Sequence, residues 1–201
     1  MNQAIKTRAK LKDIPSWVFL ALFLVSALIS LSTLRGNNQQ MIKLRGAVYA
    51  ADKDNTDVNA ALNNLRAYVY SHMNTSLSSG GNAIKPPIQL KYTYQRLQTA
   101  EQARVDTANA QIYTDAQNYC QIQNPAAFSG RTRVPCVTDY VTTHGVQAKA
   151  VAVGLYQFDF ISPAWSPDRA GWSLVVTTTV FILFVSRLFL NKLVSIKFKQ
   201  I

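Results

Sequence analysis

The feature that most constrains this chain is an uncharged apolar run from Trp17 to Leu34, whose only polar side chains are small hydroxyls. A helix rises about 1.5 Å per residue, so this run can cross most of the roughly 30 Å hydrocarbon core of a bilayer. A second apolar run, from Trp172 to Leu190, carries Arg187 near one end, where a long side chain can reach the headgroups. The two runs predict membrane spans over 17–34 and 172–190.

The formal net charge of +11 is concentrated beside these runs. The basic side chains in question are Lys6, Arg8, Lys10 and Lys12, with Asp13 the one acid among them, and then Arg187, Lys192, Lys197 and Lys199. Basic flanks mark the cytoplasmic side of a span, whereas a nucleic-acid surface needs basic residues gathered on one folded face. We therefore expect a two-pass plasma-membrane protein with cytoplasmic tails over 1–16 and 191–201, an exported domain over 35–171, and no nucleic-acid partner.

An alternative for the first run is a cleavable secretory signal, with Ser30-Leu31-Ser32 as a small-residue cleavage site. The run is long for such a signal, which favours an uncleaved anchor, and both alternatives export the middle of the chain. Tryptophan is enriched at membrane interfaces, so Trp17, Trp165 and Trp172 are the expected interfacial anchors.

The exported region is predicted to be mainly helical. Apolar residues at helical spacing continue from the first span to Ala51, with a candidate break at Gly36. A second amphipathic helix is expected from Val58 to about Leu77, with Thr56 or Asp57 as its N-cap. A third is expected from about Pro87 to Gln121. Its stripe is rich in Ala, Gln and Thr, which suits a narrow bundle or a partner helix.

Cys120 and Cys136 are the only cysteines, and they bracket a polar segment with breakers at Pro125, Gly130 and Pro135. In an exported domain two cysteines that flank a loop are expected to form a disulfide.

The residues from Val141 to Gly145 predict a short helix that ends at this glycine.

Aromatic and polar residues alternate between Leu155 and Ile161, which favours an extended segment. A lone strand must pack on the helices or pair with another chain. The candidate partner contacts are therefore Leu155, Tyr156, Phe158 and Phe160. The alternative is that this stretch only covers the membrane-proximal end of the helices.

After this stretch, the order Ser166-Pro167-Asp168 predicts an N-cap, a proline at N1 and an acid in the first turn of the second span.

No motif for catalysis, metal or cofactor stands out. The stretch that begins at Asp52 resembles a calcium loop only in the spacing of Asp52 and Asp54. Its sixth position is Asp57 where such loops have Gly, and its twelfth is Asn63 where they have Glu. Asn55 in it suits a left-handed turn. Cys136 with His144 is the remaining candidate nucleophile pair. We expect a non-catalytic protein without cofactor or metal.

The arrangement resembles the periplasmic four-helix-bundle sensor modules of bacterial chemoreceptors and sensor kinases. The resemblance rests on the segment from Leu34 to Ala51, the helix from Val58 to Leu77 and the return into the second span. Those families carry a large cytoplasmic signalling domain, where this sequence has a short basic tail. The chain is also similar to small two-span envelope proteins of bacteria.

Two functions follow as hypotheses. The first is protein–protein interaction, with a partner or a second copy, in an envelope complex. The second is small-molecule sensing through a separate signalling chain.

Overall fold

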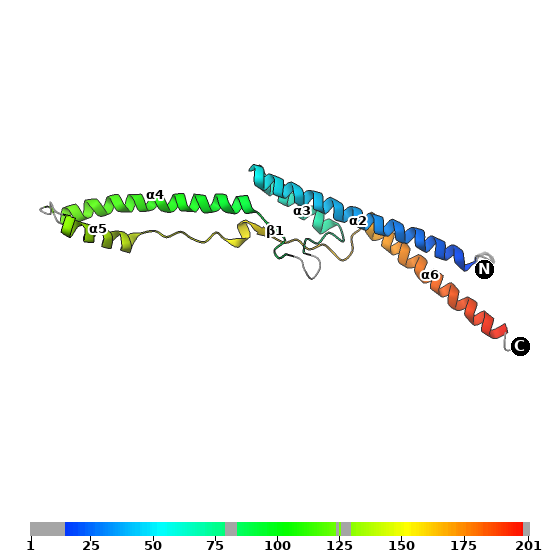
Figure 1. The fold of residues 1–201 in the computed structure, drawn as a ribbon. Helices are drawn as coiled ribbons and strands as arrows, with labels where there is room; N and C mark the ends of the chain where they lie inside the picture. Colours follow the sequence, from blue (N-terminus) through cyan, green and yellow to red (C-terminus); the bar gives the residue numbers. More distant parts are fainter. Residues whose placement is uncertain (1–14, 79–83, 124, 126–129, 199–201) are drawn as a thin grey trace, which may run out of the picture. The chain divides into compact units, whose positions relative to one another are not determined.

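The computed structural model describes residues 15–78, 84–123, 125 and 130–198, and these residues are mainly helical (Figure 1). Of the predicted tails, residues 1–14 and 199–201 lie outside the described residues. The described elements, in chain order, are α2 (Ser16–Asp54), α3 (Val58–Ser71), β1 (Ile88–Gln89), α4 (Lys91–Gln123), α5 (Gly130–His144), the 3₁₀ turn η1 (Val153–Leu155), β2 (Gln157–Phe158) and α6 (Arg169–Phe198).

The chain divides into two compact units, each described by itself. The first contains the described residues of 1–51, 57–84 and 159–201, and the second contains 52–56 and 85–158. The helical class expected from the sequence is confirmed. A single helical bundle over 35–171 is not confirmed, because those residues are shared between the two units.

In the first unit, α2 is one continuous helix, so the candidate break at Gly36 is wrong. A glycine inside a helix costs only about 1 kcal/mol relative to alanine, which the many good helix formers around it outweigh. The apolar stripe predicted beyond the first span is confirmed, since Met41, Val48 and Ala51 are buried. Two stretches, in α2 and in Arg169–Leu190 of α6, are long and apolar enough to cross a membrane.

α3 begins where the sequence predicts but ends earlier. The Asp57 side chain accepts a hydrogen bond from Ala60 N at 2.9 Å as the N-cap, and Asn55 has the expected positive φ of 53°. The helix ends at Ser71 instead of near Leu77. The backbone becomes extended at His72 (φ −128°, ψ 131°), whose carbonyl accepts a hydrogen bond from the buried Thr75 hydroxyl at 2.6 Å.

In the second unit, α4 begins at Lys91 and not near Pro87, because the preceding residues form β1. Ile88 is paired with Phe158 and Gln89 with Gln157 in an antiparallel two-stranded sheet. The extended conformation predicted for the aromatic stretch is confirmed over these two residues of β2, and its strand partner comes from the same chain.

The first turn of α4 is capped by the buried carboxylate of Asp52. Asp52 Oδ1 accepts from Thr93 N at 2.7 Å and Oδ2 accepts from Tyr92 N at 3.0 Å. Arg96 completes the arrangement with a 3.2 Å ion pair to Asp52. These bonds satisfy N–H groups that a helix start leaves without an internal partner. Asp52 is therefore a helix cap in this structure.

α5 lies side by side with α4 (Figure 1). It begins at Gly130 and contains Pro135, so Cys136 lies on a helix and not at the end of a loop as the sequence suggested. After α5 the chain is extended over 145–152 and is held on α4 by two side chains. Asn109 bonds both N and O of Val146, at 2.8 and 3.0 Å, and Glu101 Oε1 accepts from Lys149 N at 2.8 Å. We call α4, α5 and segment 145–152 the α4–α5 hairpin.

Candidate functional site

The two long apolar helices contact each other through hydroxyl groups. Ser30 Oγ and Thr177 Oγ1 lie 2.9 Å apart, and Thr33 Oγ1 and Ser173 Oγ lie 3.2 Å apart. Ser30 is buried by this contact. Between helices in a bilayer, such bonds each contribute on the order of 0.6 kcal/mol. These hydroxyls hold α2 and α6 together without placing a charge in the apolar stretch.

A polar cluster lies where α6 begins, and we call it the Asp168 cluster. Asp168 Oδ2 accepts from Asn37 Nδ2 at 2.6 Å, while Oδ1 accepts from Ser166 Oγ at 2.8 Å and Gly171 N at 2.9 Å. Ser166 is itself buried and accepts from Met73 N at 2.9 Å. Asp168 is thus the N-cap of α6. The sequence prediction of Ser166 as the cap is wrong, because the helix begins at Arg169.

The Asp168 cluster favours a charged carboxylate. Burial by itself raises the pKa of Asp168, but the hydrogen bonds from Gly171 N, Asn37 and Ser166 outweigh it, so the pKa lies below its ordinary value. The cluster joins α2, the segment after α3 and the start of α6 within the first unit. Its role is structural, since both carboxylate oxygens of Asp168 accept hydrogen bonds from within the chain.

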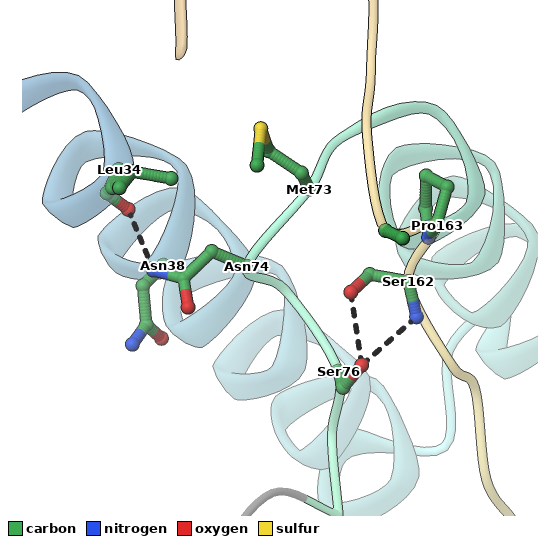
Figure 2. A pocket seen from close by; sticks show the side chains of 8 residues that line it. Leu34, Asn38, Met73, Asn74, Ser76, Ser162 and Pro163 are labelled. Carbon is green, nitrogen blue, oxygen red and sulfur yellow. Dashed lines mark hydrogen bonds between the residues drawn. The ribbon is translucent and has the colours of Figure 1, made fainter. Parts of the chain in front are cut away.

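Beside this cluster is a pocket of about 460 Å³ (Figure 2). Figure 2 shows Asn38 of α2 on one wall and the hydrogen-bonded hydroxyls of Ser76 and Ser162 on the other. Its remaining lining is Leu34, Met73, Asn74, Pro163 and Ala164. The lining residues that the structure describes carry no ionisable side chain, so they offer neutral hydrogen bonds and apolar contact.

The tryptophans expected at the interface are all exposed. Trp17 lies in the first turn of α2, and Trp165 and Trp172 flank the start of α6. The rings of Trp165 and Trp172 meet edge to face, with centroids 6.1 Å apart. Their role as interfacial anchors stays a prediction.

The predicted contact stretch is largely used inside the chain. Tyr156 packs on Tyr94 with ring centroids 4.7 Å apart, and Phe158 is half-buried in β2. Phe160 is buried and meets the Tyr70 ring edge to face. Of the four candidate contact residues, only Leu155 is exposed, at 54%.

The two cysteines are at bonding distance, as the disulfide prediction requires. Cys120 on α4 and Cys136 on α5 form a disulfide, and Cys120 is fully buried. The alternative nucleophile pair is not brought together, because Cys136 carries no thiol and His144 stacks on Tyr140. Among the described residues, no three His, Cys, Asp or Glu side chains are grouped so that they could hold a metal.

The polar residues that organise both units escaped the sequence reasoning. Each of these residues forms a hydrogen bond with a residue far along the chain. The separation is 131 positions for Asn37, 41 for Asp52 and 37 for Asn109. One local signal was present: an acid directly before the second apolar run is a helix-cap pattern.

No family model, curated protein or solved structure matches this chain.

Proposed function

We propose that this chain is a non-catalytic, two-pass membrane protein whose exported residues 35–171 bind another protein in a cell-envelope complex. Both basic tails lie in the cytoplasm, and the α4–α5 hairpin is outside. The two apolar helices and the basic residues that flank them support this proposed location.

The observation that carries the proposal is the low burial of α4. The helix has 33 residues, all described, yet only Val105, Ala116 and Cys120 are buried. Helices in proteins owe most of their stability to packing of one face, and α4 packs little for its length. Large side chains stay exposed along it, among them Tyr113, Tyr119 and Ile122. Burial of aromatic and aliphatic anchors of this kind supplies most of the energy of protein interfaces.

Co-purification from native membranes tests this function. The Ile122→Glu variant places a charge on the most exposed large hydrophobic residue of α4, which is 78% exposed. The matched control is Asn118→Glu, the same charge on an exposed polar position of the same helix. We expect a stoichiometric partner with the wild type and the control, and its loss with Ile122→Glu. Equal recovery from all three proteins contradicts a contact through this end of α4.

The location has a separate test. Single cysteines replace Thr107 on α4 or Lys192 on α6, both of which are exposed. An impermeant maleimide added to intact cells labels Thr107→Cys and not Lys192→Cys if the proposal holds. The native cysteines stay unlabelled because they are in the disulfide. Labelling of Lys192→Cys from outside overturns the proposed topology.

A second candidate function is ligand sensing through a separate signalling chain. It is favoured by one observation: a cavity of about 440 Å³ between α4 and α5, of a size that suits a small molecule. A small molecule that binds the folded protein raises its thermal stability, so a thermal-shift screen on the purified protein tests this function.

A further inference from the structure

The pocket beside the Asp168 cluster lies within the first unit, and we call it the Asn38 pocket. Four polar side chains line it together with apolar ones. The polar residues are Asn38, Asn74, Ser76 and Ser162. Its volume of about 460 Å³ falls within the range of small-ligand sites. The hydrogen-bonding groups of the pocket are separate from the Asp168 carboxylate, so the structural role of Asp168 leaves them available.

The Asn38 pocket lies where the apolar stretches of α2 and α6 end. Leu34 is in its lining and is the last residue of the apolar run in α2. The preceding residue, Thr33, has its Oγ1 3.2 Å from Ser173 Oγ at the start of α6. Ala164, also in the lining, is followed by Trp165, which is 47% exposed. Tryptophan is enriched at headgroup depth. In the proposed location the pocket therefore lies at the depth of the outer lipid headgroups.

Two consecutive asparagines of α2 differ in what their carboxamides do. Asn37 Nδ2 donates to Asp168 Oδ2 at 2.6 Å. The carboxamide of Asn38 forms no hydrogen bond with any described residue, although Asn38 is half-buried in the pocket wall (Figure 2). A half-buried polar group loses part of its hydration, and water or a ligand supplies the missing bonds. Asn38 therefore offers a ligand both a donor and an acceptor.

The other polar groups of the pocket also have unused hydrogen-bonding capacity. Asn74 Nδ2 donates to Leu34 O at 3.2 Å. Because a carbonyl can only accept, the nitrogen of Asn74 faces Leu34, and Asn74 Oδ1 is left as an acceptor. Ser76 Oγ and Ser162 Oγ lie 2.9 Å apart, and Ser162 N donates to Ser76 Oγ at 3.0 Å. The two hydroxyls share one bond, so one of their two O–H groups stays unused among the described residues.

We propose that the Asn38 pocket binds the sugar headgroup of a lipid in the outer leaflet. A sugar hydroxyl both donates and accepts, so it can donate to Asn74 Oδ1 and accept from the unused serine O–H. A phosphate ester only accepts, which leaves Asn74 Oδ1 without a donor. An ammonium group only donates, which leaves the serine O–H without an acceptor. Met73 and Pro163, in the same lining, offer apolar contact to the C–H face of a sugar ring.

This inference goes beyond protein binding and rests on the proposed location of the exported region. Binding is measured by native mass spectrometry on the full-length protein, released from micelles of an amine-oxide detergent, which carries no sugar. The probe is a monogalactosyl diacylglycerol. Phosphatidylcholine and phosphatidylethanolamine with the same acyl chains are the lipid controls. Methyl galactoside, a soluble sugar with the same ring, distinguishes a lipid from a soluble ligand.

A pair of matched variants tests the residues of the site. Asn38→Ala removes the unused carboxamide from the pocket. Gln39→Ala removes a carboxamide from the next residue of α2, which is exposed and outside the described lining. Thermal unfolding checks that each variant is folded. A photoreactive galactolipid gives a second readout on the wild type alone, in which the label should map to 34–38, 73–76 or 162–164.

We expect the galactolipid to bind wild type and Gln39→Ala alike. This binding should be at least about tenfold tighter than that of the control lipids or of methyl galactoside. Asn38→Ala should weaken galactolipid binding about fivefold, the effect of losing roughly one hydrogen bond. Binding of the control lipids should be unchanged in both variants, because they do not use the carboxamide.

The outcomes that overturn the inference differ from those that overturn the proposed function. Equal binding of the galactolipid and phosphatidylethanolamine, unchanged binding in Asn38→Ala, or a photolabel elsewhere refutes this site and leaves protein interaction standing. Methyl galactoside binding as tightly as the galactolipid refutes a lipid as the ligand. Labelling of Lys192→Cys from outside overturns the location, and the inference fails with it.

Discussion

The Asp168 cluster and the α4–α5 hairpin are stabilised by opposite means. In the cluster, one carboxylate accepts hydrogen bonds from Asn37, Ser166 and Gly171, and buried residues surround it. In the hairpin, a long helix with few buried residues is held by a disulfide and by side chains that bond the backbone of segment 145–152. In the first region Ser166 is buried and Asp168 and Asn37 are half-buried, whereas the second region leaves most of its surface exposed.

This difference indicates which region is available for binding. Surface that is already used for internal packing cannot serve a partner, and both carboxylate oxygens of Asp168 already accept hydrogen bonds from within the chain. A covalent link and a few local bonds let the hairpin stay folded while it presents exposed aromatic and aliphatic side chains. The comparison predicts that the two regions respond to different changes, and five changes test it.

The largest effect is expected from replacing Cys120 and Cys136 with serine. A disulfide that closes a loop of this size contributes about 3 kcal/mol in the chain-entropy model, and here the two cysteines are 16 residues apart. Amide hydrogen exchange of α4 and α5 should accelerate accordingly, while exchange of α3 is unchanged. Equal acceleration in α3, or none in α4, would break the comparison.

A smaller effect is expected from Asp168→Ala, which removes the N-cap of α6. Loss of a cap acceptor costs about 1–2 kcal/mol, so exchange of the Gly171 amide should accelerate and the hairpin should be unaffected. Asp168→Asn is the control, because it keeps an oxygen acceptor and should cost less. The two variants behaving alike would show that the hydrogen bonds to Asp168 do not hold this helix start.

The stability of the folded chain should depend on pH through Asp168, because the pKa of this residue is lowered in the folded chain. A carboxyl whose pKa is lower in the folded chain stabilises the fold above its unfolded pKa. That contribution is lost as the pH falls through the folded value. The Asp168→Asn variant should lose this pH dependence.

Asn109→Ala should have a moderate and local effect. The amide makes both bonds to Val146, and a typical hydrogen bond contributes about 1 kcal/mol. Limited proteolysis within 145–152 should become faster, and the disulfide should stay intact. Asn109→Asp keeps the acceptor for Val146 N and loses the donor, so its cleavage rate should fall between those of wild type and Asn109→Ala.

The smallest effect is expected at Glu101. Its hydrogen bonds with Arg104 and Lys149 N lower the pKa of Glu101 to about 2. The ionised Glu101 carboxylate accepts the hydrogen bond from Lys149 N. This contribution is complete above the ordinary glutamate pKa of 4.5 and is lost as the pH falls through about 2. Because the pair is exposed, the global stability should hardly change. The amide resonance of Lys149 should titrate near pH 2, and Glu101→Gln should abolish that titration.

Local patterns in the sequence predicted the features that local physics decides. The apolar runs, the buried stripe through Met41 and Val48, the cap at Asp57 and the turn at Asn55 each follow from residues within one or two turns. The disulfide was also expected, because two cysteines that flank a short segment have few alternatives.

The rest depends on long-range contacts that no local pattern encodes. The pairing of Ile88 with Phe158 turns what was expected to be the first turn of a helix into a strand. Gly130 and Pro135 were expected to break a helix, yet α5 contains both. Pro135 removes one backbone hydrogen bond from the helix, and the packing of α5 on α4 offsets that loss.

The central claim is that the exposed end of α4 contacts another protein, and photo-crosslinking from Ile122 in native membranes tests it most directly. A photoreactive amino acid replaces Ile122, with Asn118 replaced in parallel as the control on the same helix. We predict one discrete crosslinked product from position 122 that contains a different chain, identified by mass spectrometry, and a weaker product or none from position 118. If position 122 yields no crosslink, or the same products as position 118, this end of α4 is not an interface and the proposed function is wrong.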